Sequence, residues 1–151
     1  MNMPKIPDLS TMIFVFGSNT AGIHGAGAAR FAAHHRGAHH SIALGPMGQS
    51  YAIPTKGVIT SPLNGSDVFL KTRVGDTLPL DAIKTYVGMF LAYATAYPKL
   101  EFQVTCIGCG LAGLAHADIA PMFENEDLDN LWFDELWRPI LGGTYRYWGT
   151  F

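Results

Sequence analysis

The chain has 151 residues, of which 48% are hydrophobic and 15% are charged. That size and composition are typical of one compact domain and exclude a disordered chain. Ten Lys and Arg against twelve Asp and Glu give a net charge of -2, which argues against general nucleic-acid binding. No uncharged apolar run reaches the about 18 residues of a membrane span, and the N-terminus lacks the apolar stretch of a signal peptide. We therefore expect a soluble, cytoplasmic protein.

The charges are distributed unevenly along the chain. Residues 1–75 hold six Lys or Arg and two acids, whereas residues 76–151 hold four Lys or Arg and ten acids. Five of the six histidines also lie in the first half. An anionic ligand would therefore be expected to contact the first half, although a polar face without a ligand would give the same distribution.

The hydrophobic pattern predicts strands that alternate with helices. Met12–Phe16 is a short apolar run of β-branched and aromatic residues, typical of a buried strand. A helix is expected from Ala26 onward, where alanines follow directly on glycines. Ser50–Pro54 and Phe102–Ile107 predict two further strands, and helical spacing of apolar residues predicts an amphipathic helix from about Leu80 to Ala96. The alternation predicts the α/β class with a parallel or mixed sheet.

Two segments lack such periodicity. Residues 57–76 contain glycines and a proline and predict a long loop. Residues 124–151 form an aromatic C-terminal tail, because seven of the chain's eighteen aromatic residues lie in the last twenty positions. We expect this tail to cover the core, with an aromatic platform for a ligand's base or a dimer contact as alternatives. The chain is therefore expected to form a single domain over residues 1–151.

Residues 17–29 form a glycine-rich loop between the first expected strand and the first expected helix. Small residues there let backbone N–H groups approach a phosphate, and a helix N-terminus adds partial positive charge. No Gly-Lys-Ser or Gly-Lys-Thr follows, as a Walker loop requires, and no acid follows about 20 residues on, as a dinucleotide fold requires. The segment predicts an anion site, with close packing of helix on sheet as the alternative.

Residues 105–114 repeat this arrangement, because a strand again runs into three glycines. We expect the following helix to begin with Asp118 as its N-cap. The loops at the carboxyl ends of parallel strands form the ligand crevice of an α/β sheet. Two such loops on one edge would hold a diphosphate from both sides.

Cys106 and Cys109 form a C-x-x-C sequence. A redox dithiol would place this sequence at a helix N-terminus, and Gly108 and Gly110 oppose that arrangement. A zinc site with the histidine pairs at 34–35 and 39–40 is not expected, because neither pair has the spacing of a zinc finger. We predict no metal and no cofactor.

Four segments together carry a family resemblance: Phe16–Asn19, His24–Ala28, Tyr51–Lys56 and Ile107–Leu111. In order and spacing they resemble the ADP-ribose-binding macro domains, and most of all the branch that includes the terminal ADP-ribose protein glycohydrolase. The resemblance covers roughly residues 12–123. It implies a three-layer α/β/α fold with a mixed sheet. It also implies a small-molecule ligand, ADP-ribose or a related nucleotide, either alone or attached to a macromolecule.

The resemblance also implies the site residues. Asn19 would face the distal ribose of the ligand, and Lys56 would lie near the same sugar. The two glycine loops would hold the diphosphate. The ligand-binding residues of the two loops would be His24, Gly25, Ala26, Gly27, Ala28, Gly108, Cys109, Gly110 and Leu111.

In that branch a lysine attacks the anomeric carbon of the distal ribose, and a carboxylate serves as acid and base. Lys56 is therefore the catalytic candidate for removal of ADP-ribose. Both positions where macro-domain hydrolases carry a carboxylate hold alanine in this chain, Ala29 and Ala112. The alternatives are a non-catalytic ADP-ribose reader or sequestering protein, and an unrelated phosphate-binding module. The remaining candidate acids or bases are His24, His116 and Asp118.

Overall fold

The computed structural model of the chain describes residues 7–57, 76–125 and 127–151. Within them, six strands form one sheet in the order β2-β3-β1-β4-β5-β6. The strands are β1 (Ile13–Asn19), β2 (Gly45–Met47), β3 (Ser50–Lys56), β4 (Phe102–Val104), β5 (Leu131–Asp134) and β6 (Arg146–Gly149). The helices are α1 (Gly27–His35), α2 (Leu80–Ala96), α3 (His116–Ile119) and α4 (Arg138–Leu141), with short 3-10 turns at η1 (Ala120–Phe123) and η2 (Glu135–Trp137).

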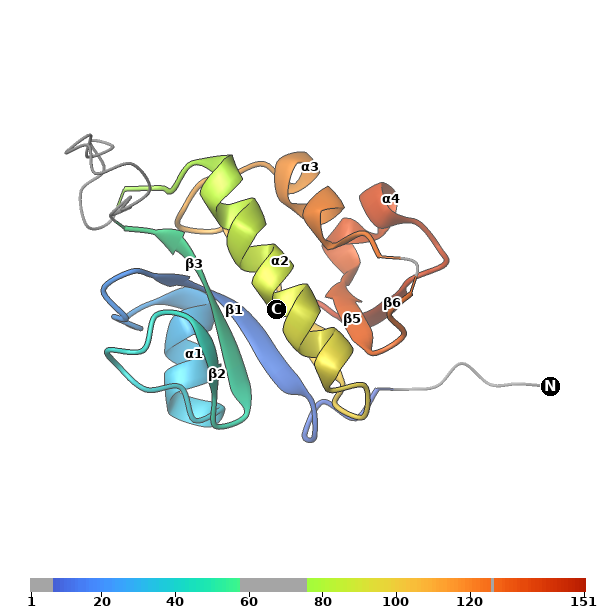
Figure 1. The fold of residues 1–151 in the computed structure, drawn as a ribbon, viewed down its shortest axis with the longest axis horizontal. Coiled ribbons are helices and arrows are strands. Elements are labelled where there is room, and N and C mark those ends of the chain that lie inside the picture. The colour runs from blue at the N-terminus through green and yellow to red at the C-terminus, as the bar shows by residue number, and fades with distance from the viewer. Residues whose placement is uncertain (1–6, 58–75, 126) are drawn as a thin grey trace.

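Helices cover both faces of this sheet (Figure 1). On one face, α1 packs over Phe14 and Phe16, with Ala32 of the helix fully buried against them. On the other face, α2 lies with α3 and α4 over a larger apolar core. The strand β2 is antiparallel to β3, whereas the other pairs are parallel. The predicted α/β/α layering with a mixed sheet is confirmed.

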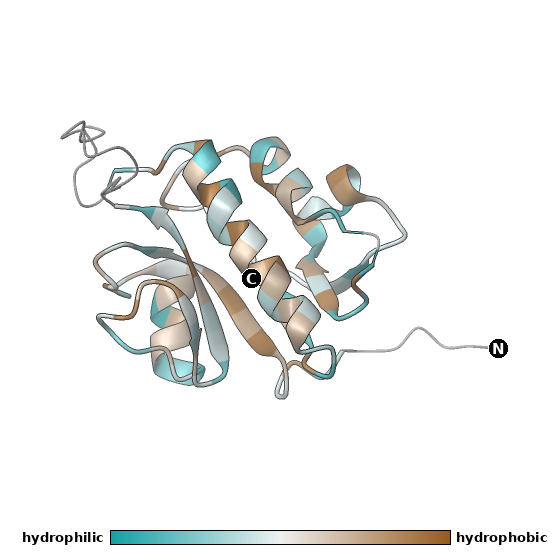
Figure 2. Ribbon diagram, in the orientation of Figure 1, coloured by the Kyte–Doolittle hydropathy of each residue, from teal (hydrophilic) through white to brown (hydrophobic). Residues whose placement is uncertain are grey.

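The strand β1 lies between β3 and β4 in the middle of the sheet, and helices bury it from both sides. Phe14, Val15 and Phe16 are all fully buried, and a strand in that position is a continuous apolar run rather than an alternating one. The brown stretch of β1 in Figure 2 shows this run. Because β3, β1, β4, β5 and β6 are mutually parallel, their carboxyl ends meet at one edge of the sheet.

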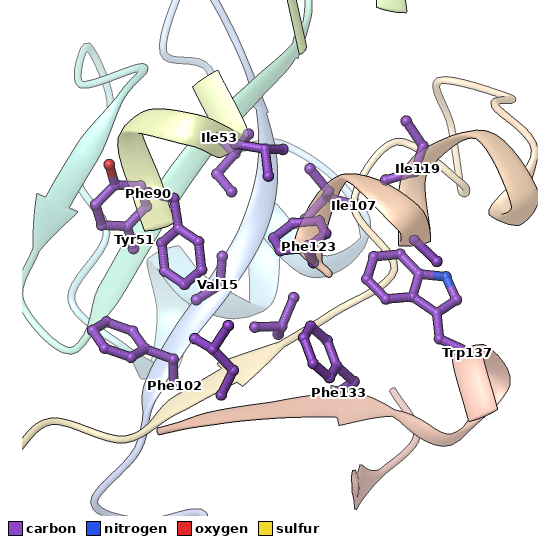
Figure 3. Packing of buried hydrophobic residues seen from close by; sticks show 14 of the residues in the cluster. Val15, Tyr51, Ile53, Phe90, Phe102, Ile107, Ile119, Phe123, Phe133 and Trp137 are labelled. Carbon is purple, nitrogen blue, oxygen red and sulfur yellow. The ribbon is translucent and has the colours of Figure 1, made fainter. Parts of the chain in front are cut away.

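The helix predicted over Leu80–Ala96 is confirmed with those bounds. Its buried residues recur at helical spacing and include Phe90. Figure 3 shows the ring of Phe90 beside those of Tyr51 and Phe102, with ring centroids 5.0 and 5.2 Å apart. Edge-on aromatic contacts of this kind fix α2 against β3 and β4.

Two predicted boundaries are wrong. The strand β4 ends at Val104 rather than Ile107, because the N–H of Ile107 turns back to donate to the Thr105 carbonyl at 2.8 Å. Asp118 is not a helix N-cap, because α3 begins at His116 with Ala115 at the capping position and no side-chain cap.

The aromatic C-terminal segment does not cover the core as a tail but extends the sheet. Residues 131–134 and 146–149 form β5 and β6, which pair in parallel beyond β4. Trp132 and Trp148 then pack with Met12 in a small buried cluster. Residues 58–75 of the long loop expected over residues 57–76 lie outside the described residues. Among the residues described, no helix is long and apolar enough to cross a membrane.

Candidate functional site

A cavity of about 710 Å³ lies at the carboxyl-terminal edge of the sheet. Its walls are formed by the carboxyl ends of β3, β1, β4 and β5, by the loops that follow them, and by Phe151 after β6. This volume is typical of small-molecule sites, and the edge is where α/β sheets bind ligands.

Ten of the eleven residues that the sequence analysis placed in the site line this cavity. They are Asn19, Gly25, Ala26, Gly27, Ala28, Lys56, Gly108, Cys109, Gly110 and Leu111. His24 is the exception, because its side chain is buried behind the first loop with 2% exposure. Its Nε2 lies 2.9 and 3.1 Å from the carbonyl oxygens of His39 and Ile42, and its ring packs edge-on against Phe16. His24 therefore ties the loop to a neighbouring segment.

The first glycine loop leads from β1 into α1. Asn19 shapes its start, since its Nδ2 donates to the Ile23 carbonyl and its Oδ1 accepts from the Ile23 N–H. The helix α1 has Ala26 at its N-cap and no side-chain cap. The N–H groups of residues 27–29 are therefore unpaired in the helix, and they make no hydrogen bond elsewhere within the described part of the chain. These N–H groups are available to an anion.

The second glycine loop follows β4 and is held from both ends. The N–H of Leu114 donates to the Gly108 carbonyl at 2.9 Å, and Thr77 Oγ1 donates to the Ala112 carbonyl at 2.7 Å. Between these anchors, the N–H groups of residues 110–112 form no hydrogen bond with any other described residue. The second loop thus offers the same kind of donor as the first.

Two of the glycines are needed for packing. A Cβ on Gly17 would lie 3.3 Å from the Gly108 nitrogen, so the first strand and the second loop could not approach as closely. Gly108 has a φ of +74° and a Cβ there would lie 3.0 Å from Leu114 Cδ1. By contrast, a Cβ on Gly110 would meet nothing within 4 Å. Gly110 can therefore be replaced without a clash, although it lines the cavity.

Charged side chains are few in the cavity. Among the described residues that line it, Lys56 is the only basic side chain of the Lys or Arg type, and Asp134 is the only acidic one. Lys56 follows β3 and Asp134 ends β5, and three strand spacings separate these strands, which is about 14 Å. Ala29 and Ala112 both line the cavity as well, so the two places expected for a carboxylate face it without one.

Asp134 was not predicted to be a site residue. It is 2% exposed, and it accepts hydrogen bonds from the N–H of Leu136, the hydroxyl of Thr150 and the N–H of Phe151. The sequence does contain a pattern that indicates it: Leu131–Asp134 is a short apolar run that ends in an acid. Such a run predicts a strand that brings a carboxylate to the edge of the sheet. Asp134 ties together the chain segments that follow β5 and β6.

His116 is the one proposed substitute acid or base that lines the cavity. Its Nδ1 accepts a hydrogen bond from Trp137 Nε1 at 3.0 Å. Asp118 is exposed and does not line the cavity, and His24 is buried behind the first loop.

Large apolar side chains also line the cavity. Four large hydrophobic side chains line it while remaining exposed: Ile23, Leu111, Leu136 and Phe151, at 58, 73, 58 and 58%. The Phe151 ring is held against Phe14 and Phe31, with centroids 5.8 and 5.5 Å apart. Apolar walls around a few polar groups are typical of ligand pockets.

The two cysteines are half-buried in the cavity wall and form no disulfide. Burial, together with the Asp134 carboxylate, raises the pKa of Cys106. Burial, together with Asp118, raises the pKa of Cys109 to about 11. Both thiols are therefore protonated at neutral pH, the opposite of a redox-active thiolate. Within residues 7–57, 76–125 and 127–151, no three His, Cys, Asp or Glu side chains gather as a metal site requires.

Comparison of the chain with protein-family models, with curated proteins and with solved structures found no match. The arrangement established for the chain is an α/β fold in which helices flank a single six-strand mixed sheet.

Proposed function

We propose that this chain binds ADP-ribose or a closely related nucleotide in the cavity at the carboxyl edge of the sheet. The observation that carries the proposal is the pair of glycine loops that follow the adjacent strands β1 and β4. Each loop offers a row of unbonded backbone N–H groups to the same cavity. Two such rows side by side match the two phosphates of a diphosphate.

The residues that line the cavity support a ligand with two arms. With a diphosphate over β1 and β4, one arm extends toward Lys56 at the end of β3. The other arm extends toward Leu136 and His116 on the β5 side of the cavity. ADP-ribose has a polar ribose on one side of its diphosphate and an adenosine on the other. Orthophosphate would use only the centre of the cavity.

The resemblance to macro domains supports the same ligand. The segments that carry it end in Asn19, the first glycine loop, Lys56 and the second glycine loop, and all four contribute to one cavity. The residues on which the resemblance rests therefore lie together at one site.

Lys56 is the residue that would give the site an activity. Its amine, after giving a proton to water, would attack the anomeric carbon of the distal ribose and form a C–N bond. The glycosidic bond would break, and the leaving group would take the electron pair and then a proton from water. The adduct would open to an imine, which borohydride can reduce, and addition of water to the imine would release the sugar and restore the amine. Because Ala29 and Ala112 supply no acid, we expect slow turnover, since a positioned acid or base contributes about 10² to 10⁴-fold.

The same alanines favour a non-catalytic reader or sequestering protein as the second candidate, with an unrelated phosphate-binding module as the third. Calorimetric titration with ADP-ribose, ADP, NAD, GDP-ribose and orthophosphate separates these functions at the binding step. We expect ADP-ribose to bind with micromolar affinity, about -8 kcal/mol, and orthophosphate far more weakly. Equal and weak binding of all five would reject the nucleotide site.

A further inference from the structure

We propose that His116 is a neutral hydrogen-bond donor to the nucleoside arm of the ligand, and that Trp137 sets its tautomer. This inference rests on the proposed function and adds a residue and a specificity to it. The Nε2–H of His116 would donate a hydrogen bond to an acceptor atom of the nucleoside, such as a ring nitrogen or a carbonyl oxygen of the base.

The tautomer follows from the partner of Nδ1. An indole N–H can only donate, so the His116 Nδ1 that lies 3.0 Å from Trp137 Nε1 must be an unprotonated acceptor. The hydrogen of the neutral imidazole is then on Nε2. Trp137 cannot turn away easily, because it is fully buried and its ring packs against Phe123 and Phe133, with centroids 5.4 and 6.1 Å apart.

This tautomer makes His116 unsuited to proton transfer. An Nε2 that carries hydrogen has no lone pair with which to act as a base. To free that lone pair, the proton must move to Nδ1, which would leave the buried Trp137 N–H without an acceptor. Loss of the Nε2 proton from the neutral ring would give an imidazolate. His116 therefore does not replace the carboxylates that positions 29 and 112 lack.

The position of His116 identifies the part of the ligand that it would contact. Its partner Trp137 follows Leu136 directly, so the hydrogen bond holds His116 on the β5 side of the cavity, opposite Lys56. The carboxylate on that side, Asp134, already accepts three hydrogen bonds within the chain. With that carboxylate engaged, the Nε2–H of His116 beside the exposed Leu136 is a donor that matches a base offering an acceptor.

Long-range ¹H–¹⁵N correlation spectra of ligand-free protein labelled on histidine test the tautomer. The His116 signals are assigned by their loss in His116→Gln. We expect the Nε2–H form in the wild type and a mixture of tautomers in Trp137→Phe, which removes the indole donor. An Nδ1–H form or an imidazolium at pH 7.5 in the wild type would overturn the proposal. The wild-type spectrum decides the matter alone if Trp137→Phe does not fold.

Titration calorimetry tests the contact. His116→Leu should weaken binding of ADP-ribose and ADP by about tenfold, the value of one hydrogen bond, and should leave pyrophosphate binding unchanged. His116→Gln should bind nearly as the wild type, because its amide can accept from Trp137 and donate to the ligand. The exposed His34→Leu is the control and should bind as the wild type.

Unchanged ADP-ribose binding in His116→Leu would overturn the contact, and so would an equal loss of pyrophosphate binding. Failure of the wild type to bind ADP-ribose would instead reject both the proposed function and this ligand contact. The spectrum would still decide the tautomer, so the two failures are distinguishable.

Discussion

The side-chain amide of Asn19 pairs with the backbone of Ile23 in both directions. Its Nδ2 donates to the Ile23 carbonyl at 2.7 Å, and its Oδ1 accepts from the Ile23 N–H at 3.1 Å. Since Asn19 ends β1, this pair directs the chain as it leaves the strand. Both residues also line the cavity, so Asn19 shapes the first loop and is a candidate ligand contact.

We expect Asn19→Ala to lower the free energy of unfolding by about 1–2 kcal/mol, because two hydrogen bonds are lost. Asn19→Asp keeps the acceptor but places a carboxylate near the expected diphosphate. Affinity for ADP-ribose should therefore fall in the order wild type, Asn19→Ala, Asn19→Asp. Urea unfolding and calorimetry measure the two quantities. Equal affinity in all three proteins would show that the Asn19 amide stabilises the loop and does not contact the ligand.

Gly110→Glu should abolish ADP-ribose binding without unfolding the protein. The substitution places a side chain and a negative charge in the cavity at a position where a Cβ meets nothing within 4 Å. Repulsion between two charges about 4 Å apart near a protein surface is about 4 kcal/mol, so we expect at least about a 100-fold loss in calorimetry.

Gly88→Glu is the matched control for this substitution. Gly88 is exposed on α2 and is likewise open to a Cβ, so binding should stay unchanged. Gly27→Glu should block the first loop in the same way, but its φ of +55° adds backbone strain. Wild-type affinity in a folded Gly110→Glu protein would place the ligand elsewhere.

Lys56→Ala should leave ADP-ribose binding within about threefold while removing any release of ADP-ribose from modified substrates. The substrates should carry the modification on acidic side chains, on serine and on nucleic-acid bases. Borohydride should trap a lysine adduct in the wild type only, and Lys84→Ala, on the exposed side of α2, should behave as the wild type. If the wild type releases no more than Lys56→Ala and no adduct is trapped, the chain is a reader.

Stability should fall below about pH 6.5 because of His24. Burial lowers the pKa of this histidine below its usual value of 6.5. The unfolded chain therefore takes up a proton at a higher pH than the folded chain, and the loss is at most about 1.4 kcal/mol per pH unit. Urea unfolding at pH 7.5 and 5.5 should show a smaller decrease for His24→Gln than for the wild type. Equal decreases in the two proteins would contradict this role of His24.

The thiol of Cys109 should react slowly with iodoacetamide at pH 8, because burial raises its pKa to about 11 and the thiolate fraction is small. Cys106→Ser isolates this thiol, and its rate should be at least about 100-fold below that of free cysteine. ADP-ribose should slow the reaction further, since Cys109 lines the cavity. A rate near that of free cysteine would show that the loop around Cys109 opens readily.

The amino-acid sequence by itself determined the elements whose signals are local. The apolar spacing over Leu80–Ala96 predicts α2 with the bounds observed. The apolar run that begins at Met12 identifies the central strand, although the strand extends to Asn19. The two glycine loops are also visible in sequence, because a strand, glycines and a helix follow one another within about a dozen residues.

The tertiary structure alone decided which residues share the cavity. The strands β5 and β6 have four residues each and are stable only through pairing with β4 and with one another, which no local pattern reveals. That pairing brings Asp134 and Phe151 to the site. The tertiary structure also determined which histidine side chain reaches the cavity. Hydrogen bonds to groups distant in sequence hold His24 behind the first loop and His116 at the cavity wall.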